Sequence, residues 1–476
     1  MQVHRQEVAM SDYTMSIDGG QVRGTNSFGV VNPATEEVFA EAPACSEAEL
    51  NAAVAAAKRA FPSWRRDETA RRQWLRQAGE RLKEDAEKIA RTLTLEQGKP
   101  LAMALGEVTT AAKQLMAAAE MPIPNEITRD DERNRIEISY RPLGVVAAIT
   151  PWNFPILIAT AKVAPALLAG NTMVLKPSPF TPLSTLQYGA VLNQVLPQGV
   201  LNVISGGNEL GALLGAHPDV RKISFTGSVS TGKKVAHTAA DDLKRITLEL
   251  GGNDPAIVLD DADVQAIAPR LFWSAFLNSG QVCLAVKRVY VPEALLSPLT
   301  AALSQLAKTV KVGDGLAPDT QLGPINNAPQ LERVIDLVDD AKRHGATLHA
   351  GGERLGRKGY FYAPTLLSNV DDDVAIVAEE QFGPVLPLLP YRDLDDAIAR
   401  ANDTNFGLGA SVWSSNLARA DEVAKQIDAG TVWINSHVAL TPLAPFTGAK
   451  WSGIGEASGR WGLAAFLQKH VINTQR

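Results

Sequence analysis

The chain has 476 residues, of which 45% are hydrophobic and 21% are charged, and it carries a formal net charge of −6 at pH 7. At about 100–200 residues per domain, this length predicts two or three domains, each large enough to bury its own core. The net negative charge and the lack of a basic cluster argue against a nucleic-acid partner. Two cysteines are too few for a disulfide framework. No apolar run reaches the about 20 residues that a membrane span needs.

The first residues of the chain lack the apolar core of a signal peptide. Met10 could open the chain as well as Met1, and we expect residues 1–12 to form a mobile tail. Together with the cysteine content, these features predict a cytoplasmic protein.

Two helices are predicted before residue 100. Ser46 and Glu49 form a capping box at the start of a helix over 46–62, along which Ala and Val recur on one face. Apolar residues at helical spacing predict one long helix over 68–95, and Gly98 ends it.

Residues 121–143 alternate charged with apolar side chains, which is typical of an amphipathic strand. Residues 466–473 near the end of the chain are a candidate partner for this strand.

From residue 144 onward, strands and helices alternate with short loops, which predicts a doubly wound sheet that binds ligands at the carboxyl ends of its strands. Strands are expected at 144–149, 172–175, 200–204, 221–225 and 245–250, and helices at 156–169, 181–195, 208–215 and 229–240. A second α/β unit follows, with strands at 255–259, 286–291, 346–349, 385–391, 408–413 and 431–434 and helices at 263–277, 294–309, 329–343, 394–402 and 417–428.

A glycine-containing turn follows the predicted strand over 221–225. Gly227 and Ser228 open the next helix there, where free N–H groups and the helix dipole favour a phosphate group. A purely structural turn is an equally good interpretation. Lys234 stands where a P-loop has Ser or Thr, and no Gly-x-Gly-x-x-Gly occurs, so the turn departs from both nucleotide-binding patterns.

Four polar side chains near strand ends are candidates for the chemistry. Asn153 lies in a loop stiffened by two prolines and is either an oxyanion donor or a helix cap. Lys176 is either a donor to ribose or phosphate or an exposed lysine. Glu249 precedes a Gly pair and is either a base with a raised pKa or an ordinary edge-strand acid. Glu380 either binds a sugar diol or belongs to a solvated turn.

Cys283 follows a turn of small residues, and a thiol near a desolvated acid is the minimum for covalent catalysis through a thioester. A lone cysteine is otherwise a small buried hydrophobe, which is our interpretation of Cys45. The histidines lack metal-ligand spacing, so no metal site is predicted. A catalytic dyad of Cys283 with His237 or His437 stays open.

In their order along the chain, these motifs resemble the aldehyde dehydrogenase superfamily over roughly residues 15–472. The shared motifs are Pro151-Trp152-Asn153-Phe154-Pro155, Lys176-Pro177-Ser178, Phe225-Thr226-Gly227-Ser228, Leu248-Glu249-Leu250-Gly251-Gly252, Gly280-Gln281-Val282-Cys283, Glu380-Gln381-Phe382-Gly383-Pro384, Asn435 and Ser452-Gly453-Ile454-Gly455. The resemblance implies an α/β fold with three parts, namely a Rossmann-like dinucleotide-binding domain over 13–120 and 144–252, a second α/β catalytic domain over 253–434, and a small β oligomerisation arm over 121–143 and 460–476.

The same resemblance implies NAD(P)-dependent oxidation of an aldehyde to the acid through a thiohemiacetal and a thioester on Cys283. Glu249 would be the general base, Asn153 with the Cys283 N–H would form the oxyanion hole, and the implied catalytic set also includes Lys176. Lys176 and Glu380 would hold the riboses. The implied cofactor-binding residues are Thr150, Trp152, Lys176, Ser178, Pro179, Gly207, Gly211, Phe225, Gly227, Ser228, Leu250, Gly251, Glu380 and Phe382.

NAD is the expected cofactor. Many NAD-preferring members of the superfamily carry a Glu three residues after the lysine, and this chain has Pro179 there, so NADP stays open. A CoA-acylating reaction, a cofactor-free cysteine hydrolase and a catalytically silent member are the alternatives. The expected partners are a small aldehyde and further copies of the chain in a homodimer or homotetramer. Apolar candidates for the access tunnel favour an aliphatic or aromatic aldehyde; they are Met103, Leu157, Ala161, Val282, Leu284 and the loop 435–443.

Overall fold

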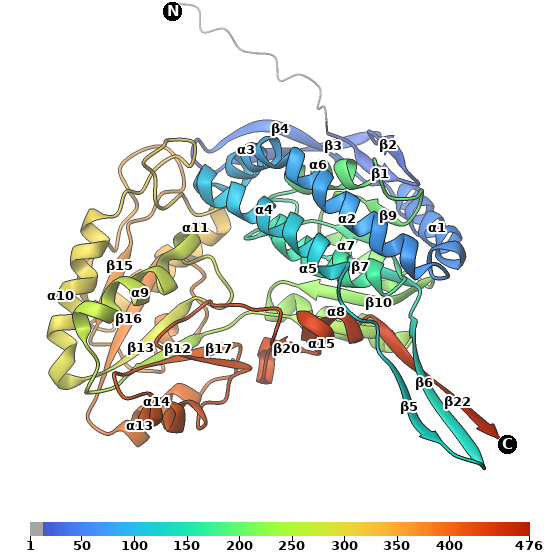
Figure 1. Cartoon of the computed structure of the whole chain (residues 1–476). Helices are drawn as coiled ribbons and strands as arrows, with labels where there is room; N and C mark the ends of the chain where they lie inside the picture. Colours follow the sequence, from blue (N-terminus) through green and yellow to red (C-terminus); the bar gives the residue numbers. More distant parts are fainter. Residues whose placement is uncertain (1–12) are drawn as a thin grey trace, which may run out of the picture.

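The computed structural model describes residues 13–476, which form two α/β parts and a projecting β arm (Figure 1). The expectations for Met10 and for a tail over 1–12 lie outside the described residues. Within residues 13–476, none of the helices combines the length and the apolar character that crossing a membrane requires.

The first sheet has eight strands and places the ends of its central strands at one edge. In spatial order its strands are β2 Gly20–Val22, β1 Met15–Ile17, β9 Leu201–Val203, β8 Thr172–Lys176, β7 Val145–Ile149, β10 Val220–Thr226, β11 Arg245–Glu249 and β20 Gly453–Ile454. The strands from β9 to β11 are mutually parallel. The chain runs from β7 to β8 and β9 in one direction and then returns to β10 beside β7. This reversal creates the crevice in which doubly wound sheets bind ligands.

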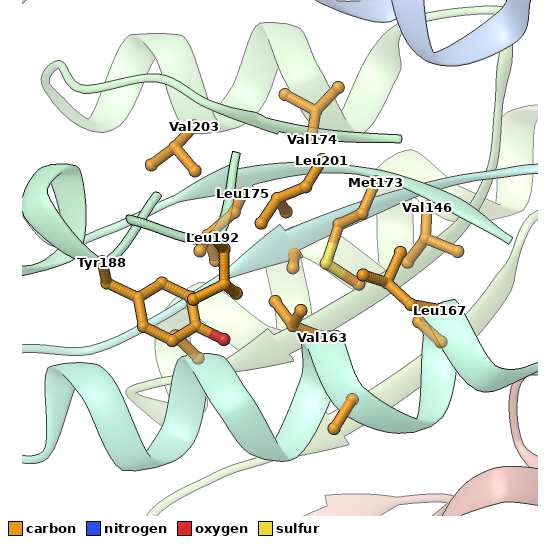
Figure 2. Packing of buried hydrophobic residues seen from close by; sticks show 14 of the residues in the cluster. Val146, Val163, Leu167, Met173, Val174, Leu175, Tyr188, Leu192, Leu201 and Val203 are labelled. Atoms are coloured by element: carbon orange, nitrogen blue, oxygen red, sulfur yellow. The ribbon is translucent and has the colours of Figure 1, made fainter. Parts of the chain in front are cut away.

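Helices cover this sheet because their apolar faces match its continuously apolar strands. The helices are α1 Glu47–Trp64, α2 Glu68–Glu84, α3 Ala86–Gln97, α4 Leu101–Ala118, α5 Pro155–Leu168, α6 Leu183–Leu192, α7 Asn208–Ala216 and α8 Val229–Asp241. Figure 2 shows Val163 and Leu167 of α5 lying against Val146 and Met173 of the sheet, all fully buried. Burying one such side chain contributes about 1.5–3 kcal/mol.

Two predictions for the amino-terminal helices have different outcomes. The capping box of Ser46 and Glu49 is confirmed at the start of α1. The single helix predicted over 68–95 is wrong, because α2 ends at Glu84 and α3 begins at Ala86. Asp85 between them leaves the helical conformation with φ −91° and ψ 6°, in line with the preference of Asp for helix ends.

The second sheet has seven strands and carries the Cys283 loop at one end. In spatial order its strands are β14 Thr347–Ala350, β15 Thr365–Ser368, β16 Val385–Tyr391, β13 Val286–Pro292, β12 Asp254–Val258, β17 Gly409–Trp413 and β18 Thr431–Ile434. Its helices are α9 Val264–Phe276, α10 Glu293–Thr309, α11 Ala328–Arg343, α12 Ala375–Ala378, α13 Leu394–Asn402 and α14 Leu417–Ala424. Only β14 runs antiparallel to its neighbour. Strand β15 was not predicted.

The arm consists of β5 Asn125–Asp130, β6 Asn134–Pro142 and β22 Leu467–Gln475 and extends away from both sheets (Figure 1). Strand β22 pairs with β6 along its whole length, which confirms the predicted partner. The segment 121–143 holds two strands where one was predicted.

The remaining elements connect these parts. Strands β3 Asn26–Asn32 and β4 Glu37–Ala44 form a hairpin, and β19 Phe446–Thr447 pairs with β21 Glu456–Ala457. After β18 the chain returns to the first sheet through β20 and packs α15 Gly459–Ala464 against α5. Residues 435–459 were left outside the predicted domain division, whose boundaries stay a prediction.

Candidate active site

A cleft of about 940 Å³ lies between the two sheets and unites most of the predicted site residues. From the first sheet it is lined by Trp152, Asn153, Gly227, Ser228, Leu250 and Gly251, and from the second by Cys283, Glu380 and Phe382. The other predicted cofactor residues, Thr150, Lys176, Ser178, Pro179, Gly207, Gly211 and Phe225, do not line this cleft, and neither does Glu249.

The Cys283 loop is held by an unusual backbone. Before it, Asn278, Ser279 and Gly280 all have positive φ, of 52°, 56° and 72°. A Cβ on Gly280 would lie 2.1 Å from the Gly383 carbonyl oxygen, so only glycine fits there. The thiol of Cys283 is half-buried, and burial raises its pKa to about 12, against the opposing charge of Lys287.

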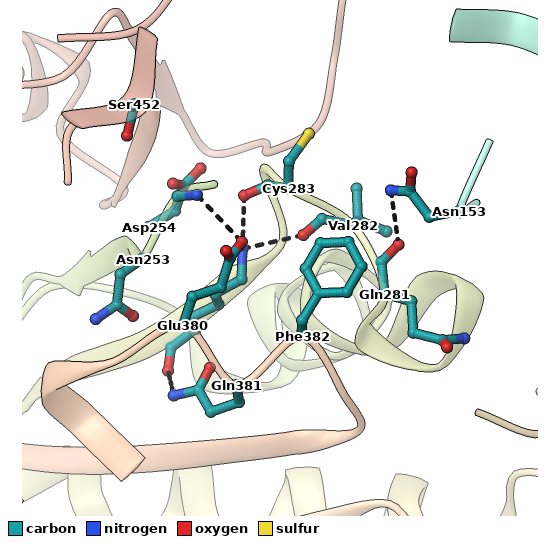
Figure 3. Close-up of polar contacts among 12 residues, drawn as sticks. Asn153, Asn253, Asp254, Gln281, Val282, Cys283, Glu380, Gln381, Phe382 and Ser452 are labelled. Atoms are coloured by element: carbon teal, nitrogen blue, oxygen red, sulfur yellow. Dashed lines mark hydrogen bonds and ion pairs between the residues drawn. The ribbon is translucent and has the colours of Figure 1, made fainter. Parts of the chain in front are cut away.

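Lys287 anchors this loop from below. Its Nζ donates to the carbonyl oxygens of Val282 at 3.0 Å and Cys283 at 2.5 Å, and it lies 3.3 Å from the Glu380 carboxylate (Figure 3). One buried ammonium therefore holds the Cys283 loop and the Glu380 carboxylate of a neighbouring segment together. Nothing in the sequence pattern marked Lys287 for this role.

Glu249, at the end of β11, is a buried acid with no hydrogen-bond partner for either carboxylate oxygen among the described residues. Burial raises its pKa to about 8, and the nearby ammonium of Lys162 opposes the shift. Lys162 is itself buried in α5 and donates to the Ser224 hydroxyl at 3.2 Å. Because β11 lies between β10 and β20, the edge-strand interpretation of Glu249 is wrong.

Asn153 joins the two sheets across the cleft. Its side-chain amide donates to the Gln281 carbonyl oxygen at 3.0 Å, two residues before Cys283 (Figure 3). The N-cap of α5 is Phe154, and the Asn153 side chain makes no hydrogen bond to the first turn of that helix, so the helix-cap interpretation of Asn153 is wrong. An amide has two N–H groups, and this contact uses one of them.

The turn after β10 presents a helix start to the cleft. Ser228 is the N-cap of α8, where its hydroxyl accepts from the Thr231 N–H at 3.3 Å. The Phe225 ring lies directly beneath Gly227, where an added Cβ would come within 2.5 Å of it. Free N–H groups at this end of a helix and the helix dipole make the turn suited to a phosphate.

Glu380 and Phe382 form the opposite wall. Glu380 is mostly buried and accepts from the Gly252 N–H at 3.1 Å, which rules out the solvated-turn interpretation. Burial raises the pKa of Glu380, and the charge of Lys287 opposes that rise. A Cβ on Gly251 would lie 2.1 Å from the Glu380 carboxylate, so the glycine keeps this strip of the cleft open. Phe382 meets Trp152 edge-on with ring centroids 5.2 Å apart.

Lys176 ends β8 and belongs to a second polar group beside the cleft. It is buried, which rules out the exposed-lysine interpretation, and its Nζ donates to the Pro177 carbonyl oxygen at 3.0 Å. Burial lowers its pKa to about 8, and the charge of Glu209 opposes that shift. Gly211 lies against its aliphatic chain, and Glu209 stands exposed in the first turn of α7. The sequence pattern did not identify Glu209.

The residues of this cleft fit a dinucleotide. A helix start suited to phosphate, a strip kept open by Gly251 and the Phe382 ring line the same cleft as the Cys283 thiol. The histidine alternative gains no support, because His237 is exposed on α8 and His437 faces Asp254 at 3.4 Å. Within residues 13–476, no group of three His, Cys, Asp or Glu side chains gathers as a metal ion would require.

Comparisons with known proteins agree over nearly the whole chain. A family model described as "Aldehyde dehydrogenase family" matches residues 21–472. The chloroplastic betaine aldehyde dehydrogenase of Beta vulgaris is 37% identical over 458 residues, which covers 93% of this chain and 92% of that protein. An aldehyde dehydrogenase of Bacillus cereus, solved in complex with NAD+, matches with a TM-score of 0.96 at 35% identity, covering 100% of this chain and 99% of that one. An NADP-dependent enzyme of E. coli matches with a TM-score of 0.95 at 36% identity, covering 98% of each chain.

Proposed function

Because the chain belongs to the aldehyde dehydrogenase family, we propose that it oxidises an aldehyde to the carboxylic acid with NAD as the hydride acceptor, through a thiohemiacetal and a thioester on Cys283. One observation carries this proposal. A thiol, an amide donor, a helix start suited to phosphate and a glycine-lined strip meet in a single cleft.

In the first step, the Cys283 thiol gives its proton to solvent and the thiolate adds to the carbonyl carbon, so that the carbonyl oxygen becomes an alkoxide. The free N–H of the Asn153 amide and the backbone N–H of Cys283 donate to that oxygen, and one such donor is worth about 10²–10³ in rate. When bound, an oxidised nicotinamide would supply the hydride acceptor. The charge of Lys287 opposes the burial that raises the thiol pKa.

The alkoxide then collapses, the hydride leaves the former carbonyl carbon, and a thioester remains on Cys283. Trp152, Phe382 and Glu380 would hold the nicotinamide end of the cofactor, whereas Gly227 and Ser228 would hold the pyrophosphate. Lys176, beside Gly211, holds the adenosine ribose.

Glu249 removes a proton from the water that attacks the thioester, and the thiol leaves with the release of the acid. A carboxylate without hydrogen-bond partners is free to accept this proton. Transfer of the acyl group to CoA needs no such base, so the buried Glu249 favours water over CoA.

The cofactor preference rests on an acid at an unexpected position. Pro179 leaves the third position after Lys176 without charge, but Glu209 places a carboxylate close enough to influence the Lys176 ammonium. A carboxylate there accepts from a 2′-hydroxyl and repels a 2′-phosphate, so NAD is favoured over NADP.

The expectations about domain boundaries, assembly and location stay predictions. The division into domains at 252 and the arm over 121–143 and 460–476 stay proposals, as does assembly into a homodimer or homotetramer through that arm. Ile127, Val471 and Ile472 expose apolar side chains on it, which supports its use as a contact between copies. The cytoplasmic location stays a prediction.

Product analysis tests the proposed reaction. The enzyme with NAD and apolar aldehydes of graded length should form NADH and carboxylic acid in equal amounts, and added CoA should not divert the product. Cys283→Ala should bind NAD but form no NADH, whereas Cys45→Ser should stay active as the matched thiol control. Acyl-CoA as the main product would contradict the hydrolytic assignment.

Substitution of the acid isolates the second half of the reaction. Glu249→Gln should slow deacylation by about 10²–10⁴, so that a burst of about one NADH per site precedes a slow steady state. Since the Glu249 pKa is raised to about 8, the carboxylate form grows as pH rises through that value, and the deacylation rate of the unsubstituted enzyme should rise with it. Stopped-flow absorbance measures both effects, and an unchanged steady rate in Glu249→Gln would contradict the role.

Cofactor preference provides a third prediction. Glu209→Gln removes one repulsive charge and should lower the ratio of kcat/KM for NAD to that for NADP by about 10-fold. Asp241→Asn changes an exposed acid at the far end of α8 and should leave the ratio unchanged. If the ratio stays the same in Glu209→Gln, another group selects the cofactor.

A further inference from the structure

A buried ion pair lies behind the Asn153 loop and has no part in the mechanism described above. Lys99 follows the end of α3, Glu107 lies in α4, and their Nζ and Oε2 atoms are 2.5 Å apart. The two side chains are 0% and 1% exposed. Withdrawing two charges from water costs free energy. The attraction between the charges offsets this cost only if the geometry is good and further hydrogen bonds satisfy both groups.

Lys99 reaches the backbone of Asn153 itself. Its Nζ donates to the Asn153 carbonyl oxygen at 2.7 Å and also lies 3.8 Å from the centre of the Phe154 ring. The side chain of Asn278, from the Cys283 loop, donates to the same carbonyl oxygen at 3.2 Å. The Asn153 carbonyl is therefore clamped between the first sheet's helices and the loop that carries the nucleophile.

Glu107 holds the following turn. Its Oε1 accepts from the backbone N–H groups of Ile156 at 2.9 Å and Leu157 at 3.1 Å. These are first-turn donors of α5, a helix that has no side-chain cap of its own. A carboxylate at this position both satisfies the free donors and complements the helix dipole, so Glu107 fixes where α5 begins.

The two contacts bracket Asn153 on both sides. Its carbonyl is held by Lys99, the turn after it is held by Glu107, and its side-chain amide has one N–H on the Gln281 carbonyl oxygen. The backbone of Asn153 is therefore fixed, and the second N–H of its amide is not used by the contact with Gln281.

We propose that Lys99 and Glu107 are positioning residues for the reaction, which hold the Asn153 amide where the alkoxide forms. The inference rests on the proposed function, since it requires Asn153 to be an oxyanion donor. Neither residue touches the substrate. Their effect on rate passes through Asn153, and a displacement of about 1 Å at such a group can cost about 10² in rate.

A double-mutant cycle on kcat/KM tests this dependence. Lys99→Met keeps the length of the side chain, removes the donor and should lower kcat/KM by about 10- to 100-fold. In an Asn153→Ala background, the same change should lower it by less than about 3-fold, because the group that Lys99 positions is already gone. Equal losses in both backgrounds would show a general structural role and overturn the inference.

Two further measurements keep the outcome interpretable. The Kd for NAD should stay within about 3-fold in every variant, since the pair lies behind the loop and not in the cofactor cleft. Arg71→Met is the matched control, because Arg71 is a buried cation that donates to the Leu168 carbonyl oxygen at the opposite end of α5. It should lower Tm but leave kcat/KM within about 3-fold, and a loss as large as that of Lys99→Met would count against the inference.

The design also separates the failure of this inference from the failure of the proposed function. If Asn153→Ala alone leaves kcat/KM unchanged, Asn153 is not an oxyanion donor and the proposed mechanism is wrong at that point. If Asn153→Ala lowers kcat/KM and Lys99→Met does not, only the positioning role is wrong.

Because Lys99→Met leaves the Glu107 charge unpaired, Lys99→Met/Glu107→Gln is made alongside it. This charge-free pair should fold and show the same dependence on Asn153.

Discussion

The proposed mechanism depends on two groups that the fold withdraws from water, the Glu249 carboxylate and the Cys283 thiol. Glu249 ends β11 without a hydrogen bond to either oxygen, and Cys283 is partly buried by the opposing part of the chain. An unpaired buried carboxylate is unfavourable in a folded protein. The desolvation that makes the Glu249 carboxylate unfavourable also raises the pKa of Glu249 toward neutrality. A general base is effective when its pKa lies in that range.

The two sheets bring these groups together without either sheet containing both. The first sheet ends β7, β8, β10 and β11 at one edge, and the reversal of strand order between β7 and β10 opens the crevice there. The second sheet places the Cys283 loop opposite that edge. Buried cations then hold the facing loops, with Lys287 bound to the Cys283 carbonyl oxygen and Lys99 to the Asn153 carbonyl oxygen. Each of them binds backbone carbonyl oxygens, so the loops are fixed by their main chain and do not depend on side-chain packing alone.

Local signals in the sequence were enough for most of the fold and for many of the residues that line the cleft. The apolar strands and the turns that follow them placed Asn153, Gly227 and Glu249 at one edge of a doubly wound sheet. The signals failed where a neighbour distant in sequence decides the outcome. Asp85 divides one periodic segment into two helices, and β15 is too short to stand out. Lys99, Lys162, Glu107 and Glu209 act through contacts with other segments, which no spacing along the chain reveals.

The central claim is that the acyl group resides on the sulfur of Cys283 between oxidation and hydrolysis. Glu249→Gln enzyme mixed with NAD and an aldehyde, quenched with acid within the first turnover and digested, offers the most direct measurement. Mass spectrometry of the peptide that contains Cys283 should show the added mass of the acyl group, which hydroxylamine then removes. NADH formation without any acyl group on this peptide would contradict the account.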